Sequence, residues 1–390
     1  MQKALDLIKK AFHNIDPVLF VCATVLSLIS IFTIWGAVDN FGRSKLTMQI
    51  AMFVVGMIVT VIIASLDFRA IIDHFWLHML IGSVAVLLIT ILFGSSGESR
   101  ETANRSWLQI PGVGLMIQPS EFVKFTFICT FSKHLFTVRD HINRPLTVLW
   151  LMLHAVLVVG PILLSGDLGV ALVYMGIILL MLFCAGLHPL YFVAILGLLL
   201  LLFPFLWDHL AEYQRERILV GFNPELDPGG KGLQPLRSRA AIAAGGFFGV
   251  GLLGGGIYEN LAASHTDFIF ATVCEKFGFL GGAIVLILFM IIVVRIFMLA
   301  RSAAMTDYGG LICVGVGAML VVQILINIGM CLAMLPVIGI TLPFLSCGGS
   351  SMLATFMMFG LLHNVYAHSH GVRIDAARDT LDIDISLLNS

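Results

Sequence analysis

Side chains that could perform chemistry gather in one polar segment of this chain, residues 213–278. The segment carries groups able to bind anions or exchange protons, among them Arg215, Arg217, Glu259, His265, Asp267 and Glu275. Long apolar runs flank it, at 168–207 and 277–294. A polar loop without hydrophobic length cannot cross a bilayer, so it must lie on one face of a membrane-embedded body. There it could meet a substrate that is part lipid and part polar head group.

Asp267 lies in the sequence His265-Thr266-Asp267-Phe268, directly before an apolar stretch. An Asp at this place could cap the following helix. The neighbouring carboxylates favour a catalytic or binding role instead, because Glu259 precedes Asp267 by eight residues and Glu275 follows it by eight. Glu275 with its neighbour Lys276 is expected to form a solvated pair at the membrane interface.

A second polar group falls inside an apolar stretch. Lys124 follows Glu121 by three residues in QPSEFVK, so both side chains lie on one face of a helix. Pro119 suits the first turn of that helix, and Ser120 could cap it. Ionisable groups inside a membrane are costly and usually face a cavity, which favours a functional role. A purely structural ion pair is the alternative.

Two further candidates lie between apolar stretches. Arg105 and Trp107 belong to a short polar loop, where a Trp can serve equally as an interfacial anchor or as part of a site. Asp167, in SGDLG, is expected mainly to cap the helix that follows it.

The composition shows which elements must position these residues. The chain of 390 residues is 59% hydrophobic and 12% charged, with a mean hydropathy of +1.01, well outside the range of soluble domains. Apolar stretches of about 18 to 22 residues match the bilayer core. The sequence predicts an all-α polytopic membrane protein with about ten transmembrane helices at 17–37, 46–66, 75–93, 120–136, 146–164, 168–187, 191–207, 277–296, 309–335 and 347–367.

The basic residues predict the orientation of these helices. No small-residue cleavage site ends the first span, so we expect an uncleaved helix with a cytoplasmic N-terminus. Lys and Arg then concentrate on the cytoplasmic side, whereas the short outer loops hold only Arg43, Lys45, Arg100 and Arg105, in agreement with the positive-inside rule. The chain, 1–390, is expected to be one membrane domain. It comprises seven helices within 17–207, a large extracytoplasmic loop at 208–276 between helices 7 and 8, three helices within 277–367, and a cytoplasmic tail at 368–390.

Several functions are disfavoured by the composition. A net charge of −1 argues against a basic nucleic-acid binder. The seven cysteines show no CxxC or CxxH spacing, so no disulfide framework or metal cluster is expected. A GxxxxGK[ST] motif for nucleotide phosphates is also missing.

Taken in order, the polar motifs resemble those of the SEDS family (shape, elongation, division and sporulation proteins, such as RodA, FtsW and SpoVE). The resemblance covers residues 16–365 and rests on the motifs at 105–107, 118–124 (QPSEFVK), 167–169, 213–217 (YQRER), 222–224, 265–270 (HTDFIF) and 342–351 (LPFLSCGGSS). The chain departs from the common family pattern at 102–107, 165–167, 237–238 and 261–264. Neither Asp267 nor Lys124 is affected by these departures.

The resemblance implies a peptidoglycan glycosyltransferase that polymerises lipid II outside the bacterial cytoplasmic membrane during elongation, division or sporulation. It also implies ten helices, a class B penicillin-binding transpeptidase as partner, and other membrane proteins of the elongation or division machinery. The family's essential aspartate corresponds to Asp267, its functionally important Trp to Trp107, and the neighbouring Arg to Arg105. A loop carboxylate of the division branch has the spacing of Glu259.

The expected reaction is an inverting sugar transfer in which a polyprenyl pyrophosphate leaves. A base must take the proton of the attacking hydroxyl, and cations or a divalent metal (Mg²⁺ or Mn²⁺) must stabilise charge on the leaving group. Asp267 is the predicted catalytic residue, as base or as metal ligand. The predicted substrate-binding residues are Arg105, Trp107, Glu121, Lys124, Arg215, Arg217, Glu259 and His265.

Two rival functions remain at this stage. A flippase or transporter of lipid-linked precursors predicts charges deep in several spans and repeat symmetry between halves. The charge here concentrates in one outer loop, which favours an enzyme. A catalytically silent scaffold for a partner enzyme is the third possibility.

Overall fold

A computed structural model describes residues 15–96, 105–109, 116–209, 212–303 and 308–388. Within these ranges each predicted span corresponds to a helix. They are α2 (Pro17–Trp35), α4 (Arg43–Ser65), α5 (Phe68–Phe93), α6 (Pro119–Thr137), α7 (Pro145–Leu164), α8 (Leu168–Cys184), α9 (Pro189–His209), α12 (Ile269–Ala303), α13 (Gly309–Cys331) and α14 (Gly349–Leu388). Of the basic residues that predict the orientation, Arg100 and those within 1–14 lie outside the described residues.

Hydrophobic length supports a membrane protein. Six described helices are long and apolar enough to cross a bilayer, namely α2, α4, α5, α7, α12 and α13. Helices α8 and α9 contribute shorter apolar stretches. The prediction of an all-helical polytopic membrane protein is therefore confirmed, apart from one small antiparallel pair of β1 (Leu108–Gln109) with β2 (Met116–Ile117).

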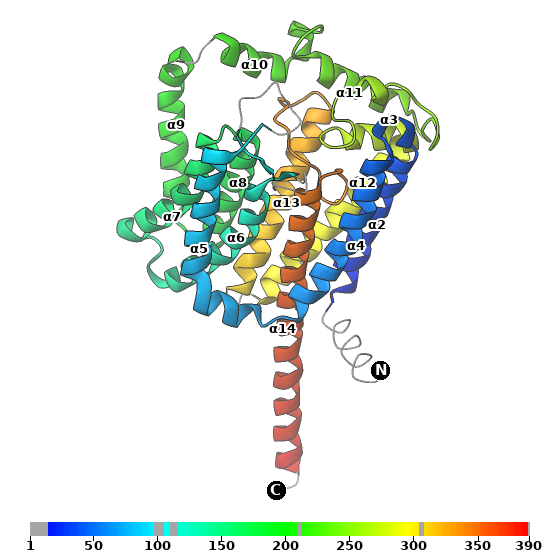
Figure 1. Cartoon of the computed structure of the whole chain (residues 1–390). Helices are drawn as coiled ribbons and strands as arrows, with labels where there is room; N and C mark the ends of the chain where they lie inside the picture. Colours follow the sequence, from blue (N-terminus) through cyan, green and yellow to red (C-terminus); the bar gives the residue numbers. More distant parts are fainter. Residues whose placement is uncertain (1–14, 97–104, 110–115, 210–211, 304–307, 389–390) are drawn as a thin grey trace.

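Small residues let the helices approach closely at their contacts. Gly176 of α8 faces Val322 of α13, and Gly56 of α4 faces Phe356 of α14; a Cβ at either glycine would lie within 2.4 Å of that neighbour. Close backbone approach through glycine is a usual way to pack helices in lipid. The result is a bundle with α13 at its centre, contacting α6, α8, α12 and α14 (Figure 1).

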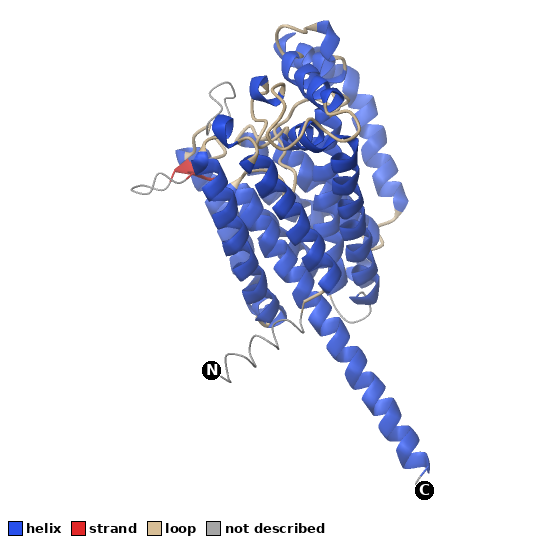
Figure 2. Cartoon of the chain, turned by 90° about the vertical axis from the view of Figure 1, so that its right-hand side faces the viewer, coloured by secondary structure: helices blue, strands red, loops and turns tan. Residues whose placement is uncertain are grey.

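The polar segment between α9 and α12 is folded into short elements. It contains α10 (Glu212–Phe222), α11 (Leu233–Ala244) and two 3-10 turns, η2 (Pro224–Leu226) and η3 (Tyr258–Asn260). These lie at one end of the bundle, together with α3 (Val38–Phe41), as Figures 1 and 2 show. A remaining 3-10 turn, η1 (Arg139–His141), joins α6 to α7.

Helices α5 and α12 begin about two turns before their predicted starts at 75 and 277. Helix α5 begins at Phe68 because the carboxylate of Asp67 accepts the backbone N–H of Ala70 and caps it. Helix α12 begins at Ile269, but it is interrupted at Gly278, whose φ of 66° is not helical. Residues 269–277 thus form a separate first section of α12 directly after Asp267.

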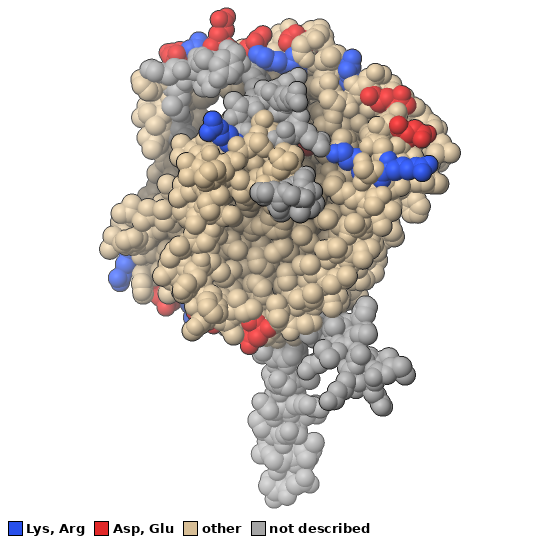
Figure 3. All heavy atoms as spheres, in the orientation of Figure 1, with Lys and Arg blue, Asp and Glu red and all other residues tan. Residues whose placement is uncertain are grey.

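Charged side chains lie at the two ends of the molecule. In the view of Figure 3 they gather over α10, α11 and α3 at one end and in smaller number at the other, with a band almost free of charged side chains between. Such a band is what a bilayer-spanning protein presents to lipid.

The predicted orientation can be tested with an impermeant thiol reagent. Gly229 is exposed with open space at its Cβ position, and Asp140 in η1 is exposed at the other end. Gly229→Cys should react in cells whose outer envelope admits the reagent, whereas Asp140→Cys should not, because the reagent cannot cross the cytoplasmic membrane. Both variants need Cys184→Ser, since Cys184 is the exposed native cysteine among the described residues. The reverse labelling pattern would overturn the topology.

Candidate active site

Asp267 lies in a turn whose backbone is held by two distant parts of the chain. The side-chain amide of Asn327, in α13, donates to the carbonyls of Asp267 (2.8 Å) and Ile340 (2.7 Å). The hydroxyl of Ser346 donates to the carbonyl of Thr266 (2.7 Å), and the backbone N–H of Cys347 donates to that of His265 (2.8 Å). Three consecutive carbonyls are therefore fixed, which sets the position of the Asp267 carboxylate.

The Asp267 side chain is free of the capping role that the sequence allowed. Among the described residues no backbone N–H donates to its carboxylate, so it does not cap α12. Burial raises its pKa to about 6, the charge of Asp167 adds to this, and the Thr266 hydroxyl offsets part of it. The side chain is still partly exposed. A carboxylate with a pKa near the working pH is well suited to accept a proton.

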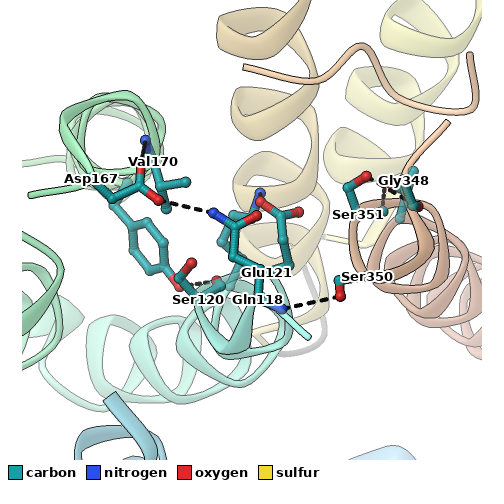
Figure 4. A network of polar contacts seen from close by, with 11 residues as sticks. Gln118, Ser120, Glu121, Asp167, Val170, Gly348, Ser350 and Ser351 are labelled. Atoms are coloured by element: carbon teal, nitrogen blue, oxygen red, sulfur yellow. Dashed lines mark hydrogen bonds and ion pairs between the residues drawn. The ribbon is translucent and has the colours of Figure 1, made fainter. Parts of the chain in front are cut away.

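Asp167 has two roles at this site. Its carboxylate accepts the backbone N–H of Val170 (3.1 Å), which confirms the predicted cap of α8, and it also accepts the side-chain amide of Gln118 (2.9 Å) (Figure 4). The backbone N–H of Gln118 donates in turn to the hydroxyl of Ser350 at the start of α14 (3.1 Å). Gln118 and Ser350 were not among the predicted site residues, although both belong to the motifs that carry the family resemblance.

The predicted pair of Glu121 and Lys124 is confirmed. The Lys124 ammonium lies 2.7 Å from a Glu121 carboxylate oxygen, and both residues are buried. Glu121 points into the same polar network as Gln118 (Figure 4). The expectation that Ser120 caps this helix is wrong: α6 begins at Pro119, so Ser120 is already within the first turn.

Arg105 lies against the turn that carries Asp167, and Trp107 follows it on the same loop. The backbone N–H of Arg105 donates to the carbonyl of Ser165 (2.9 Å), while its side chain is exposed. Trp107 is half-buried and pairs through its backbone with Ser95, after the end of α5. This loop therefore borders the network of Asp167 and Gln118.

The other predicted residues lie apart from this network or only border it. His265 packs its ring against Phe41, with 5.2 Å between centroids. Glu259 is exposed in η3. Arg215, in α10, donates to the carbonyl of Asp208 (2.7 Å), at the end of α9. The side chain of Arg217 lies outside the described part of the chain.

Glu275 and Lys276 do not form the solvated pair that the sequence suggested. Both are 1% exposed. The Glu275 carboxylate accepts three backbone N–H groups, and the Lys276 ammonium donates to carbonyls of Gly36 and Leu252. The prediction is wrong because the chain before η3 folds over the first section of α12 and covers both side chains.

The described residues contain no group of three or more His, Cys, Asp or Glu side chains placed to hold a metal ion. Asp167 lies close enough to Asp267 for its charge to raise the pKa of that carboxyl. Mg²⁺ is often held by one or two carboxylates together with substrate phosphate oxygens, so this pair fits a metal that arrives with its substrate.

Comparison with known proteins shows the family of this chain. The family model of the cell cycle proteins FtsW, RodA and SpoVE matches residues 14–371. The chain belongs to this family.

Similar proteins come from several branches of it. A probable peptidoglycan glycosyltransferase FtsW of Trichlorobacter lovleyi is 32% identical over 93% of this chain and 96% of its own length. Stage V sporulation protein E of Bacillus subtilis is 37% identical, covering 75% of this chain and 80% of that protein. Peptidoglycan glycosyltransferase MrdB of Escherichia coli K12 is 30% identical over 92% of this chain and 96% of its own length.

Solved structures agree on the fold. A chain of a peptidoglycan synthase complex superposes with a TM-score of 0.78, at 27% identity, and covers 91% of this chain and 98% of its own length. The rod shape determining protein RodA of Thermus thermophilus gives a TM-score of 0.67 at 24% identity, covering 90% of this chain and 96% of its own. The latter likeness shows the fold alone.

A role of the buried Glu121–Lys124 pair in substrate binding can be separated from its contribution to the stability of the fold. Breaking a buried pair by Lys124→Met should cost about 3–5 kcal/mol, because Glu121 is left charged and unpaired. The double variant Glu121→Gln, Lys124→Met should recover the melting temperature, since replacing both charges is often neutral. If Lys124 serves the substrate, the double variant should still fail to bind lipid II. Recovery of both stability and binding would make the pair structural.

Proposed function

We propose that this chain polymerises lipid II into glycan strands at the outer face of the bacterial cytoplasmic membrane, with Asp267 as the general base. The chain is a peptidoglycan glycosyltransferase of the SEDS family. The observation that carries the catalytic assignment is the Asp267 carboxylate, which is partly buried, has a pKa raised to about 6, and is mounted on a backbone fixed by Asn327 and Ser346.

The proposed topology places all ten long helices across the membrane, with both termini in the cytoplasm. Helices α10 and α11 then lie outside, above the network of Asp167, Gln118 and Asp267. A carboxylate at the outer end of the bundle can reach a sugar whose lipid tail stays in the bilayer. This placement supports a polymerase acting on a lipid-linked substrate.

The proposed reaction has one bond formed and one broken at the anomeric carbon. The attacking sugar hydroxyl loses its proton to Asp267 as its oxygen bonds to the anomeric carbon. The bond from that carbon to the pyrophosphate oxygen breaks, and its electron pair leaves with the polyprenyl pyrophosphate. No acid is required for such a leaving group, because charge on the phosphate oxygens can be stabilised by cations.

Several cations are candidates for that stabilisation. Arg105 has an exposed side chain on the loop that borders Asp167. Lys124 is buried beneath the same network, bound to Glu121. Arg215 donates to the carbonyl of Asp208 at the end of α9, and Arg217 belongs to the same helix, α10. A divalent metal held by Asp267 and Asp167 would supply the same charge when it arrives with the pyrophosphate.

The remaining predicted residues are proposed to bind the sugar and peptide portions of the substrate. Trp107 is half-buried on the loop that carries Arg105, and Glu259 is exposed in η3. His265 is also half-buried and presents its ring next to Phe41.

The proposed partner is a class B penicillin-binding transpeptidase, within the elongation or division machinery. A similar chain in a solved structure belongs to a peptidoglycan synthase complex that couples polymerisation to crosslinking. Coupling of this kind suits an enzyme that makes glycan strands but lacks a crosslinking domain in its described residues.

The base assignment predicts the behaviour of two substitutions at one position. Asp267→Ala and Asp267→Asn should both lower the rate of polymerisation of labelled lipid II by about 10² to 10⁴, the usual cost of removing a general base. Expression, melting temperature and association with the transpeptidase should stay near wild type, because the backbone of residue 267 keeps its bonds. Long glycan products from Asp267→Asn at close to the wild-type rate would move the catalytic centre elsewhere.

The pH dependence follows from the raised pKa of Asp267. A base works only when deprotonated, and that fraction rises with pH through about 6. The initial rate should therefore fall about tenfold per pH unit below this value and level off above it. Measurement of initial rates from acidic to neutral pH, with melting temperatures taken at each point, checks this. An acidic limb at the ordinary Asp pKa of about 3.9 would contradict the buried base.

A further inference from the structure

A glycine-rich loop, residues 245–256, joins α11 to η3 on the proposed outer side of the protein. Its sequence, GGFFGVGLLGGG, contains no charged or hydrogen-bonding side chain. Its large side chains are nevertheless turned outward: Phe248 is 77% exposed and Leu253 is 82% exposed. An apolar surface of this kind indicates contact with something other than water.

The backbone of this loop is bonded into the interruption of α12. In an unbroken helix the N–H groups of Phe279 and Leu280 would bond to the carbonyls of Glu275 and Lys276. Here they donate to the loop carbonyls of Gly246 (2.8 Å) and Phe247 (3.2 Å). The released helix carbonyls accept loop N–H groups in exchange.

The return bonds complete this exchange. The N–H of Val250 donates to the carbonyl of Glu275 (3.0 Å), and that of Gly251 donates to the carbonyl of Lys276 (3.1 Å). The close approach requires glycine: a Cβ on Gly249 would lie 2.1 Å from the carbonyl oxygen of Lys276. The loop thus replaces one turn of helix as the hydrogen-bond partner of α12.

The charged side chains of α12 complete the backbone bonding. The Glu275 carboxylate accepts N–H groups of Gly256 (2.9 Å), Ile257 (3.0 Å) and Tyr258 (2.9 Å). The Lys276 ammonium donates to the carbonyl of Leu252 (2.8 Å). It also donates to the carbonyl of Gly36 (3.0 Å) and lies 4.5 Å from the centre of the Tyr258 ring. These two buried side chains therefore supply the loop backbone with hydrogen bonds that water would supply to an ordinary surface loop.

We propose that the glycine-rich loop is immersed in the outer leaflet of the membrane, with Phe247, Phe248 and Leu253 among the lipid acyl chains. Non-helical backbone is tolerated at membrane depth only where it is buried in protein or lines a water-filled cavity. The bonds with α12 hold part of the loop backbone, between Gly246 and Gly256, against the protein, so that its apolar side chains can face lipid. The inference needs the chain to span a membrane but does not depend on the reaction it catalyses.

Lipid is the occupant that the surroundings favour. Phe247 stacks on Phe279 of α12 with 5.8 Å between ring centroids, and Phe279 and Leu280 are exposed on the flank of a membrane-spanning helix. The loop surface is therefore continuous with a surface that already faces acyl chains. On the other side Leu252 abuts Gly36, next to the exposed Trp35 at the end of α2. Trp at a helix end is typical of the membrane interface.

Immersion of this loop would also fix the depth of the catalytic turn. The first section of α12 begins two residues after Asp267 and carries both Glu275 and Lys276. The loop and Asp267 are thereby attached to the same rigid piece of helix.

Nitroxide accessibility in proteoliposomes tests the proposal. Phe248→Cys and Leu253→Cys are spin-labelled in a Cys184→Ser background, with Gly229→Cys as the matched control on the same side of the protein. Collision rates are measured with oxygen, which concentrates in lipid, and with a water-soluble nickel chelate. Labels at 248 and 253 should show several-fold higher oxygen and lower nickel accessibility than the label at 229.

Two outcomes would overturn the proposal. Nickel accessibility at 248 and 253 equal to that at 229 would place the loop in water. Low accessibility to both reagents would mean that protein, such as a second copy or a partner's membrane helix, covers the patch instead of lipid. Unchanged melting temperatures of the labelled variants show that the fold is intact in each case.

Discussion

Where water is excluded, a backbone group outside a helix must find its partner within the protein, and this constraint shapes the segment around Asp267. The turn before α12 has three consecutive backbone carbonyls that no helix bonds. They accept hydrogen bonds from the side chains of Asn327 and Ser346 and from the backbone N–H of Cys347. Further along α12, the break at Gly278 exposes four more groups, which the glycine-rich loop satisfies. An unmade bond at such a place costs about 1–3 kcal/mol, so these partners define a single conformation for the turn that carries Asp267.

The same constraint explains the distribution of charge inside the bundle. Lys124 is buried with Glu121, and Asp16 is buried with Arg295 at the opposite end of the bundle, where Asp16 also caps α2. Each charge has its counterion, as burial of a lone charge would demand a large desolvation energy. Asp267 differs, because it has a like-charged neighbour in Asp167 and no cation among its described contacts. A carboxylate left in this state holds a proton more readily, which is the property that a base near neutral pH requires.

At the interruption of α12, buried charges also satisfy the backbone groups of a non-helical segment. Glu275 and Lys276 are adjacent in sequence, yet each side chain forms hydrogen bonds with backbone groups and not with the other. The carboxylate serves donors and the ammonium serves acceptors, so a loop with no polar side chains of its own can be held tightly. Two buried charges of opposite sign remain close enough to limit the electrostatic cost of burying either.

The sequence by itself determined the class of the protein and the positions of its helices, because hydrophobic length is a local property that a bilayer selects directly. It also indicated Asp267 as a catalytic candidate, and it predicted the pair of Glu121 and Lys124, since helical spacing places these two on one face. The meeting of Gln118, Asp167, Asp267 and Ser350 was decided only by the tertiary structure, as these residues come from four separate parts of the chain. The environment of Glu275 and Lys276 was decided there too. Adjacent charges look solvated in any local window, and only the fold shows that a loop from 20 to 30 residues earlier covers them.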